Sequence, residues 1–502
     1  MTELKLKPNY HDFCFRITDI YIYVMLFAFP LFTGFEGYSN VTVSKYIFLA
    51  AVTALWFIAL LAFGLASRKL FCKRKISLAG GLVLLYVLLC CVSAVFSPYK
   101  VSVLLGEGRF DGIITIILSF LIFIGISEFA RPKLSYFYAA AAAVTLNCIV
   151  GIFQILGFNP LHLFPGTYDF YDAGIKFTST FLGTIGNADL FSAYICLVLP
   201  LVCVHYITAV KRPPEFLPVI LICAFSLFYC GVSGGMLAFA VTALVAAPLV
   251  VSSGERLRRA LEIAFVVSIA VFFAASFKAS DSGTGVTVAF SLSHYSAASV
   301  LLATLAAILR LMLRKSEFIE KPLRVFFCAL SAAAVVCGFV TAYFWTGTEG
   351  TIYELSRVLH GKVSDSFGSS RILIWRKTLA LVPERLLIGG GPGTLALRLD
   401  VEFTRFVKET GATLSSTVDN AHNAYLGILI NTGLLSLAAY LSAQGVALFK
   451  AMKAAKAEML CLACGLLCYW MQDFFGLALF IVSPMMWVFW GLLVSGLRNR
   501  EN

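Results

Sequence analysis

Charged residues are scarce in this chain of 502 residues, since Asp, Glu, Lys and Arg together make up only 13% of it. Soluble domains carry about 25% charged residues. Hydrophobic residues reach 60%, and the mean hydropathy is +0.89. This composition excludes an ordinary soluble domain and indicates a protein that crosses a membrane many times.

Motifs for nucleotide and zinc chemistry are missing as well. The sequence contains neither a GxxxxGK[ST] phosphate loop nor an HExxH zinc motif. We therefore expect no ATP-driven reaction, no zinc-dependent hydrolysis, no catalytic metal and no cofactor. We also find no internal repeat of the kind that transporters commonly have.

Cysteines are absent from the loops that we expect outside the cell. All fourteen lie in apolar runs or, like Cys14 and Cys72, in segments expected in the cytoplasm. No disulfide framework is therefore implied. Cys461 and Cys464 form a CxxC inside an expected membrane helix, where helix packing explains them better than metal or redox chemistry.

Apolar runs account for most of the chain. A membrane helix needs about 20 predominantly apolar residues, and the sequence predicts an all-α polytopic membrane protein with about fourteen such helices, twelve to fourteen being plausible. The polar stretch 1–16 does not have the form of a cleavable signal peptide, so we expect the first helix to insert uncleaved. The expected helices are 18–35, 46–66, 77–97, 112–129, 136–157, 188–209, 216–230, 235–252, 260–277, 291–312, 325–345, 423–447, 459–480 and 482–497.

The basic residues between these runs predict the orientation. The net charge is +12, but the excess lies in short loops, so it favours a membrane topology over a nucleic-acid partner. With the N-terminus in the cytoplasm, 25 Lys and Arg residues fall inside and five fall in short outside loops. The chain is thus expected in the inner (plasma) membrane with both termini cytoplasmic. The five outside are Lys45, Lys100, Arg109, Lys176 and Lys278.

One long polar segment, 346–422, stands apart from the apolar runs. It holds nine of the 39 basic residues and is expected to be a large, partly helical extracytoplasmic loop. The chain then divides into membrane helices 1–11 in 1–345, this loop with the candidate active site in 346–422, and helices 12–14 with a short cytoplasmic tail in 423–502.

Two features of this loop suit anion binding. Residues 368–377 look like a capped helix start followed by an amphipathic helix that carries Arg371 and Arg376. After Pro383, the glycine run 389–393 contains Gly391 and Gly393. Arginine binds phosphate oxygens through two parallel hydrogen bonds, and a glycine-rich turn can bring backbone N–H groups to a phosphate. A plain flexible turn is the alternative interpretation of the glycine run.

His422 ends the polar loop and stands next to Asn423 at the start of the twelfth expected helix. A histidine can act as a general base near neutral pH or donate a hydrogen bond to a pyrophosphate oxygen. The alternative is a structural histidine at a helix end.

Two further charged residues are candidates. Asp473 lies inside an apolar run, where an ionisable group is either functional or half of a buried pair. Arg109 lies in an outside loop between Glu107 and Asp111, so it either braces this loop or binds a ligand. Asn187 is expected to cap the helix that follows it.

The order of these motifs resembles the O-antigen ligase and polymerase superfamily, which includes lipopolysaccharide O-antigen ligases, O-antigen polymerases and pilin-type oligosaccharyltransferases. The stretches LLGEGRFDG at 104–112 and GTIGNADLFSAY at 183–194 are similar to segments of its members. The resemblance is strongest over 366–440, in Ser370-Arg371-x-x-x-Trp375-Arg376, Pro383, Gly389-Gly390-Gly391-Pro392-Gly393, Asp419-x-x-His422-Asn423-x-Tyr425-Leu426 and Gly433-Leu434-Leu435.

The resemblance implies a GT-C-like, metal-independent, inverting glycosyltransferase that uses glycan carried on undecaprenyl pyrophosphate. Arg371 would bind the pyrophosphate leaving group, and His422 would activate the acceptor hydroxyl or orient the donor. Arg109 and Arg376 would be secondary anion contacts. The acceptor would be a glycan, a lipid or a protein, and the surrounding partner is membrane lipid.

One position departs from the family pattern. Many relatives carry a Ser-Arg-Gly step where this chain reads Val232-Ser233-Gly234-Gly235, and Lys176 or Lys278 would have to replace that arginine. Two other classes stay open: a flippase or transporter of lipid-linked glycan, and a cell-wall polymerase of the shape, elongation and division type. The sequence does not separate ligase from polymerase.

Overall fold

The structure is a computed structural model that describes residues 10–66, 76–159, 161–164, 171–172, 175–176, 181–281, 286–348, 350–407 and 412–498. Cys72 and the first basic residues, Lys5 and Lys7, lie outside the described residues. The helices are α1 (Tyr10–Tyr23), α2 (Phe29–Leu31), α3 (Val41–Ala66), α4 (Leu78–Phe96), α5 (Ser102–Leu105), α6 (Ile113–Phe129), α7 (Leu134–Ile155), α8 (Ala188–Thr208), α9 (Phe216–Tyr229), α10 (Ser233–Val250), α11 (Gly254–Ser276), α12 (His294–Met312), α13 (Glu320–Tyr343), α14 (Thr351–Leu359), α15 (Phe367–Ala380), α16 (Ala424–Thr432), α17 (Leu434–Ala454), α18 (Ala457–Gln472) and α19 (Ser483–Arg498).

Strands form only three antiparallel two-stranded hairpins in the described chain. They pair β1 (Tyr171–Asp172) with β2 (Ile175–Lys176), β3 (Phe277–Asp281) with β4 (Val286–Phe290), and β5 (Glu402–Val407) with β6 (Ala412–Thr417). The expected all-α membrane fold is therefore confirmed, with small hairpins added at loops.

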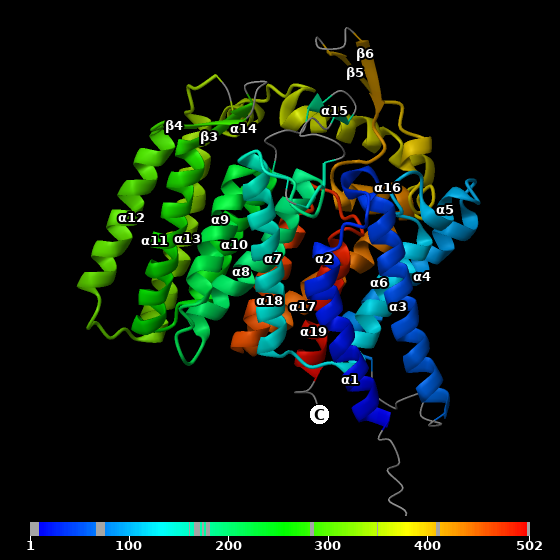
Figure 1. Ribbon diagram of the computed structural model, residues 1–502, viewed down its shortest axis with the longest axis horizontal. Coiled ribbons are helices and arrows are strands. Elements are labelled where there is room, and N and C mark those ends of the chain that lie inside the picture. The colour runs from blue at the N-terminus through cyan, green and yellow to red at the C-terminus, as the bar shows by residue number, and fades with distance from the viewer. Residues whose placement is uncertain are drawn as a thin grey trace, which may run out of the picture.

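Ten helices of the described chain are long and apolar enough to cross a membrane, and α6, α9 and α18 are shorter apolar helices. Each of the fourteen expected runs overlaps one of these helices or α19. Most helices run side by side, while α14, α15 and the β5–β6 hairpin gather at one end of the bundle (Figure 1). We call this the loop end. The start of α1 and the end of α19 lie at the opposite end (Figure 1).

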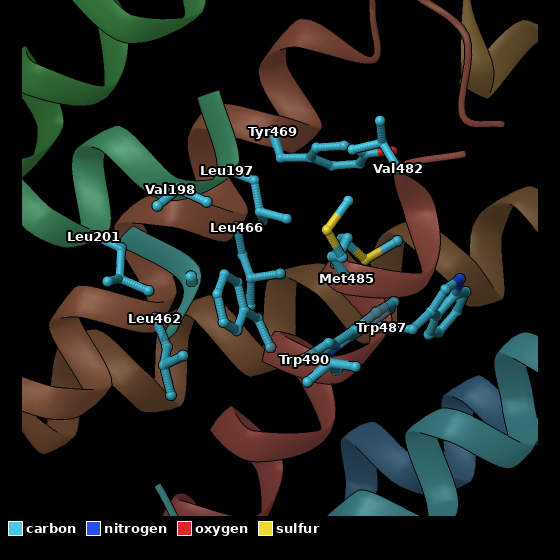
Figure 2. Close-up of a cluster of buried hydrophobic side chains, with 14 of the residues drawn as sticks. Leu197, Val198, Leu201, Leu462, Leu466, Tyr469, Val482, Met485, Trp487 and Trp490 are labelled. Carbon is cyan, nitrogen blue, oxygen red and sulfur yellow. The ribbon is translucent and has the colours of Figure 1, made fainter. Parts of the chain in front are cut away.

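The centre of the bundle is α8. In an 18-residue window of α8, 89% of the residues are buried inside the protein, against 6% in a window of α13, so α13 lies at the edge of the bundle. In Figure 2, Leu197 and Leu201 of α8 belong to one apolar cluster with Leu462 and Leu466 of α18 and with Met485 and Trp490 of α19. This apolar core leaves the loop end as the place where polar groups collect.

Two expected boundaries are wrong. The predicted helix 423–447 is two helices, α16 and α17, separated at Gly433, and the run 459–480 stops being helical after Gln472. Gly433 has a φ of +88°, and an added Cβ would lie 2.2 Å from the carbonyl oxygen of Leu387. The residue after it, Leu434, donates its backbone N–H to Leu386 (2.8 Å), so this break attaches the large loop to the bundle.

Replacing Gly433 by alanine should therefore destabilise the protein. A side chain at this φ, against a backbone carbonyl, costs about 1–3 kcal/mol. We expect a lower midpoint of thermal unfolding for Gly433→Ala in detergent. The matched control is Gly445→Ala in α17, where an added Cβ meets nothing within 4 Å. An unchanged midpoint for Gly433→Ala would contradict the strained geometry.

Candidate active site

A second, small apolar core at the loop end fixes the large loop against α16. It joins residues from α15, from the segment after the glycine run, and from α16 itself. Its buried members are Ile374, Leu395, Leu399, Val401, Val418, Ala421, Leu426 and Ile430. Trp375 of α15 adds edge contacts with Phe474, just beyond α18. The polar residues that lie between these apolar residues in the sequence are thus held in position by packing on both sides.

The segment 418–423 carries the candidate histidine in a bent conformation. Val418 and Ala421 are buried and bracket Asp419. The Asn420 side-chain oxygen accepts a hydrogen bond from the backbone N–H of His422 (3.1 Å), and His422 has a φ of +48°. Asn423 caps α16 by accepting a hydrogen bond from the N–H of Leu426 (3.0 Å).

Arg371 stands where the irregular first part of α15 becomes regular helix. Gly368, Ser369 and Ser370 all have positive φ, and the Arg371 Nη1 donates to the Gly368 carbonyl (3.1 Å). Its Nη2 lies 3.6 Å from the Asp189 carboxylate at the start of α8. The Arg371 Nε is buried and has no hydrogen-bond partner among the described residues.

Arg109 reaches the same site from the loop before α6. Its Nε donates to the Asp419 carboxylate at 2.6 Å, and both side chains are about one-third exposed. The backbone N–H of Glu107 donates to the Gly393 carbonyl (2.9 Å), which joins this loop to the glycine run. Arg109 and Arg371 both lie close enough to His422 to act on its charge, so the three residues form one site.

His422 is half-buried among these four charged groups. Burial lowers the pKa of its imidazole below the usual value, and the nearby Arg371 and Arg109 lower it further, while Asp189 and Asp419 partly oppose them. A histidine with a lowered pKa is neutral at pH 7, so it can accept a proton.

Backbone strain gathers at this site. Four of the six non-glycine residues with positive φ in the described chain lie in its loops, namely Phe110, Ser369, Ser370 and His422. Such conformations persist where the surrounding structure enforces them, and they cluster at functional sites.

The glycine run 389–393 packs against the end of α16. The N–H groups of Gly390 and Gly391 donate to the carbonyls of Ile430 (3.0 Å) and Asn431 (2.8 Å), the last residues of α16. These bonds satisfy carbonyls that a helix end leaves open. An added Cβ at Gly393 would lie 2.5 Å from the Cα of Gly106, so the run also permits close packing.

We call Arg109, Asp189, Arg371, Asp419 and His422 the charged cluster. Two other expected site residues, Arg376 and Asp473, are not part of it. Arg376 is 65% exposed and pairs with Asp365 at 2.6 Å. Asp473 is only 1% exposed; its backbone carbonyl accepts a hydrogen bond from the N–H of Ala424 (2.9 Å), and its Oδ1 has no partner among the described residues. Lys278 is exposed on β3, and the Lys176 side chain lies outside the described residues.

The family's missing arginine has no space in this chain. An added Cβ at Gly235 would lie 2.0 Å from the Ser192 hydroxyl of α8, and at Gly234 it would lie 2.7 Å from Phe475. The start of α10 is therefore used for close helix packing.

Sequence reasoning missed three charged residues of this region. Asp189 pairs with Arg371, and its only signal was its place just after Asn187, which caps α8 as expected. Asp111 was seen only as a neighbour of Arg109. Arg398 gave no signal, yet its guanidinium donates to Ile430 and Asn431 at the end of α16.

The fold and the site define a class: a multi-pass, all-α membrane protein with a cationic, histidine-containing site at one end of its helix bundle. Residues 282–441 match the family model described as O-antigen ligase. This match supports the expected O-antigen ligase and polymerase superfamily over that part of the chain. It includes Arg371, the glycine run and His422, whereas Arg109 and Asp189 lie outside it. No curated protein matches the chain.

The electrostatic account of His422 predicts a shift on removing Arg109. Arg109→Ala deletes a cation that lowers the His422 pKa and leaves the Asp419 carboxylate unpaired, so this pKa should rise. Diethyl pyrocarbonate modifies only neutral imidazole, and peptide mass spectrometry localises the adduct. The pH midpoint of His422 modification should move to higher pH in Arg109→Ala and stay unchanged in Lys377→Ala, an exposed cation on α15. A midpoint that stays or falls in Arg109→Ala would contradict this account.

Proposed function

We propose that this protein transfers or polymerises glycan from an undecaprenyl-pyrophosphate donor onto an acceptor hydroxyl at the extracytoplasmic face of the inner membrane, in the synthesis of a cell-surface polysaccharide. The observation that carries the proposal is the meeting of Arg109, Arg371 and His422 at the loop end, although they come from distant parts of the chain. The family match supports glycan transfer in a membrane as the kind of activity.

The cations of the site suit the leaving group. A pyrophosphate gains negative charge as its bond to the sugar breaks, and charge-assisted hydrogen bonds from arginine stabilise that charge. Arg371 is only loosely paired, 3.6 Å from Asp189, and its Nε lacks a partner among the described residues. A diphosphate oxygen would satisfy this guanidinium better than the resting contact does.

His422 suits the other half of the reaction. Its lowered pKa keeps the imidazole neutral, so a ring nitrogen accepts the proton of the acceptor hydroxyl. The acceptor oxygen forms a bond to the anomeric carbon from the face opposite the leaving group, which inverts the configuration. The bond from that carbon to the phosphate oxygen breaks, and the lipid pyrophosphate leaves with the electron pair, without a metal.

The position of the site fits a lipid-borne donor. The ten apolar spans support a position of the loop end at a membrane surface, where an isoprenoid would stay in the bilayer while its pyrophosphate and glycan project outward. The distribution of basic residues favours the extracytoplasmic side for this end, with both termini in the cytoplasm.

Substitution of the two central residues tests the proposal. Arg371→Ala and His422→Ala should each lower the amount of surface polysaccharide made by a complemented deletion strain about 100-fold or more, because losing one transition-state donor or a general base costs 10²–10⁴-fold. Lys377→Ala and His294→Ala are matched controls, both exposed and outside the site.

Protein level and melting temperature must be equal among the variants. Normal polysaccharide from both Arg371→Ala and His422→Ala would overturn the assignment of this site and favour the alternative of a flippase or transporter.

A further inference from the structure

A cavity of about 130 Å³ lies beside segment 418–423, and Asn420 of this segment lines it. Its lining comes from the loop before α6, from the glycine run and segment 418–423, from the segment before α19, and from α4, α6, α16, α17 and α19. Asn420 and Ala424 line it from either side of His422. A single buried water needs only about 10–15 Å³ of such space, so this cavity admits a larger group.

The lining has a composition that excludes a pyrophosphate. Among the described residues that line it there is no Lys or Arg, and the one charged residue is the acid Asp111. Hydroxyl and amide side chains such as Asn420, Asn431 and Ser483 share the lining with the rings of Tyr440 and Trp487 and with several aliphatic side chains. Polar groups of this kind bind neutral hydroxyls, whereas an alkyl chain would leave them without partners.

Asp111 is the most distinctive member of the lining. Its Oδ1 is shielded from solvent, has no hydrogen-bond partner among the described residues, and is enclosed between Gly106 and Gly393, where an added Cβ would lie 2.2 and 2.6 Å from it. Burial raises the pKa of this carboxyl to about 6. The residue as a whole stays partly exposed and lines the cavity, so its carboxyl group can meet a ligand there.

Gly427 gives access to the cavity from α16. This helical residue lines the cavity, and an added Cβ there meets nothing within 4 Å. A glycine inside a helix is less favourable than alanine. Its presence keeps the space open.

We propose that this cavity is a subsite for a neutral, hydroxyl-bearing sugar unit, with the Asp111 carboxyl as the hydrogen-bond acceptor for one of its hydroxyls. The proposal rests on the glycan transfer proposed above. The sugar belongs either to the acceptor or to the first residue of the donor glycan, because both present the same chemistry.

Filling the cavity tests the subsite. Gly427→Leu should lower surface polysaccharide at least tenfold in the complemented deletion strain, at equal protein level. Gly338→Leu in α13 is the matched control, because it adds the same side chain at a helical glycine with nothing within 4 Å, and it should leave the amount unchanged. Full product from Gly427→Leu would overturn the proposal.

Asp111→Asn gives a second test that does not change volume. It keeps the shape of the side chain and removes the charged acceptor, so product should fall about 10- to 100-fold. This variant also decides the case if Gly427→Leu fails to fold, and unchanged product from Asp111→Asn would then overturn the proposal.

A third experiment decides whether the sugar comes from the acceptor or from the donor. Gly427→Leu is purified in nanodiscs formed from membranes of the deletion strain that expresses it, and the copurifying lipids are measured. Normal copurification of glycan-bearing undecaprenyl pyrophosphate, with product lost, assigns the subsite to the acceptor. Reduced copurification of that lipid, with unchanged undecaprenyl phosphate, assigns it to the donor sugar.

Failure of this inference is distinct from failure of the proposed function. If Arg371→Ala abolishes product while Gly427→Leu and Asp111→Asn do not, the function stands and the subsite falls. If Arg371→Ala and His422→Ala also leave product unchanged, the proposed function itself fails.

Discussion

The anchoring of segment 418–423 is the constraint on which the rest of the site depends. Val418 and Ala421 are fixed in the small apolar core, and the Ala424 N–H is bonded to the Asp473 carbonyl at the end of α18. These contacts force His422 into positive φ and place Asp419 against Arg109. A membrane bundle with lipid on its sides thereby gains one rigid polar site at its end.

The charges of this site are arranged in pairs of unequal strength. Arg109 is held by a short contact with Asp419, while Arg371 faces Asp189 across 3.6 Å. Partly buried pairs are screened less by salt than exposed ones, so each arginine stays in place without being neutralised by solvent ions. The looser pair is the one that an incoming anion can open, and the tighter pair positions the loop beside it.

The sequence was sufficient for the membrane fold because span length and hydropathy depend on local composition. The order of Arg371, the glycine run and His422 was sufficient for the family, and the Asn187 cap was visible from its neighbours. The break at Gly433 was hidden inside an apolar run, since its cause is the carbonyl of Leu387, distant in sequence. Asp189 was missed for the same reason. Its partner Arg371 lies on another helix, and an ion pair between distant elements cannot be recognised from the residues next to either partner in the sequence.

The most direct test of the central claim is the mass profile of undecaprenyl-pyrophosphate-linked glycans in membranes of a deletion strain, compared with wild type. The account predicts that lipid-linked glycan accumulates when the protein is absent. Single repeat units on the lipid would identify a polymerase, and long chains retained on the lipid would identify a ligase. A profile identical to wild type would contradict glycan transfer by this protein.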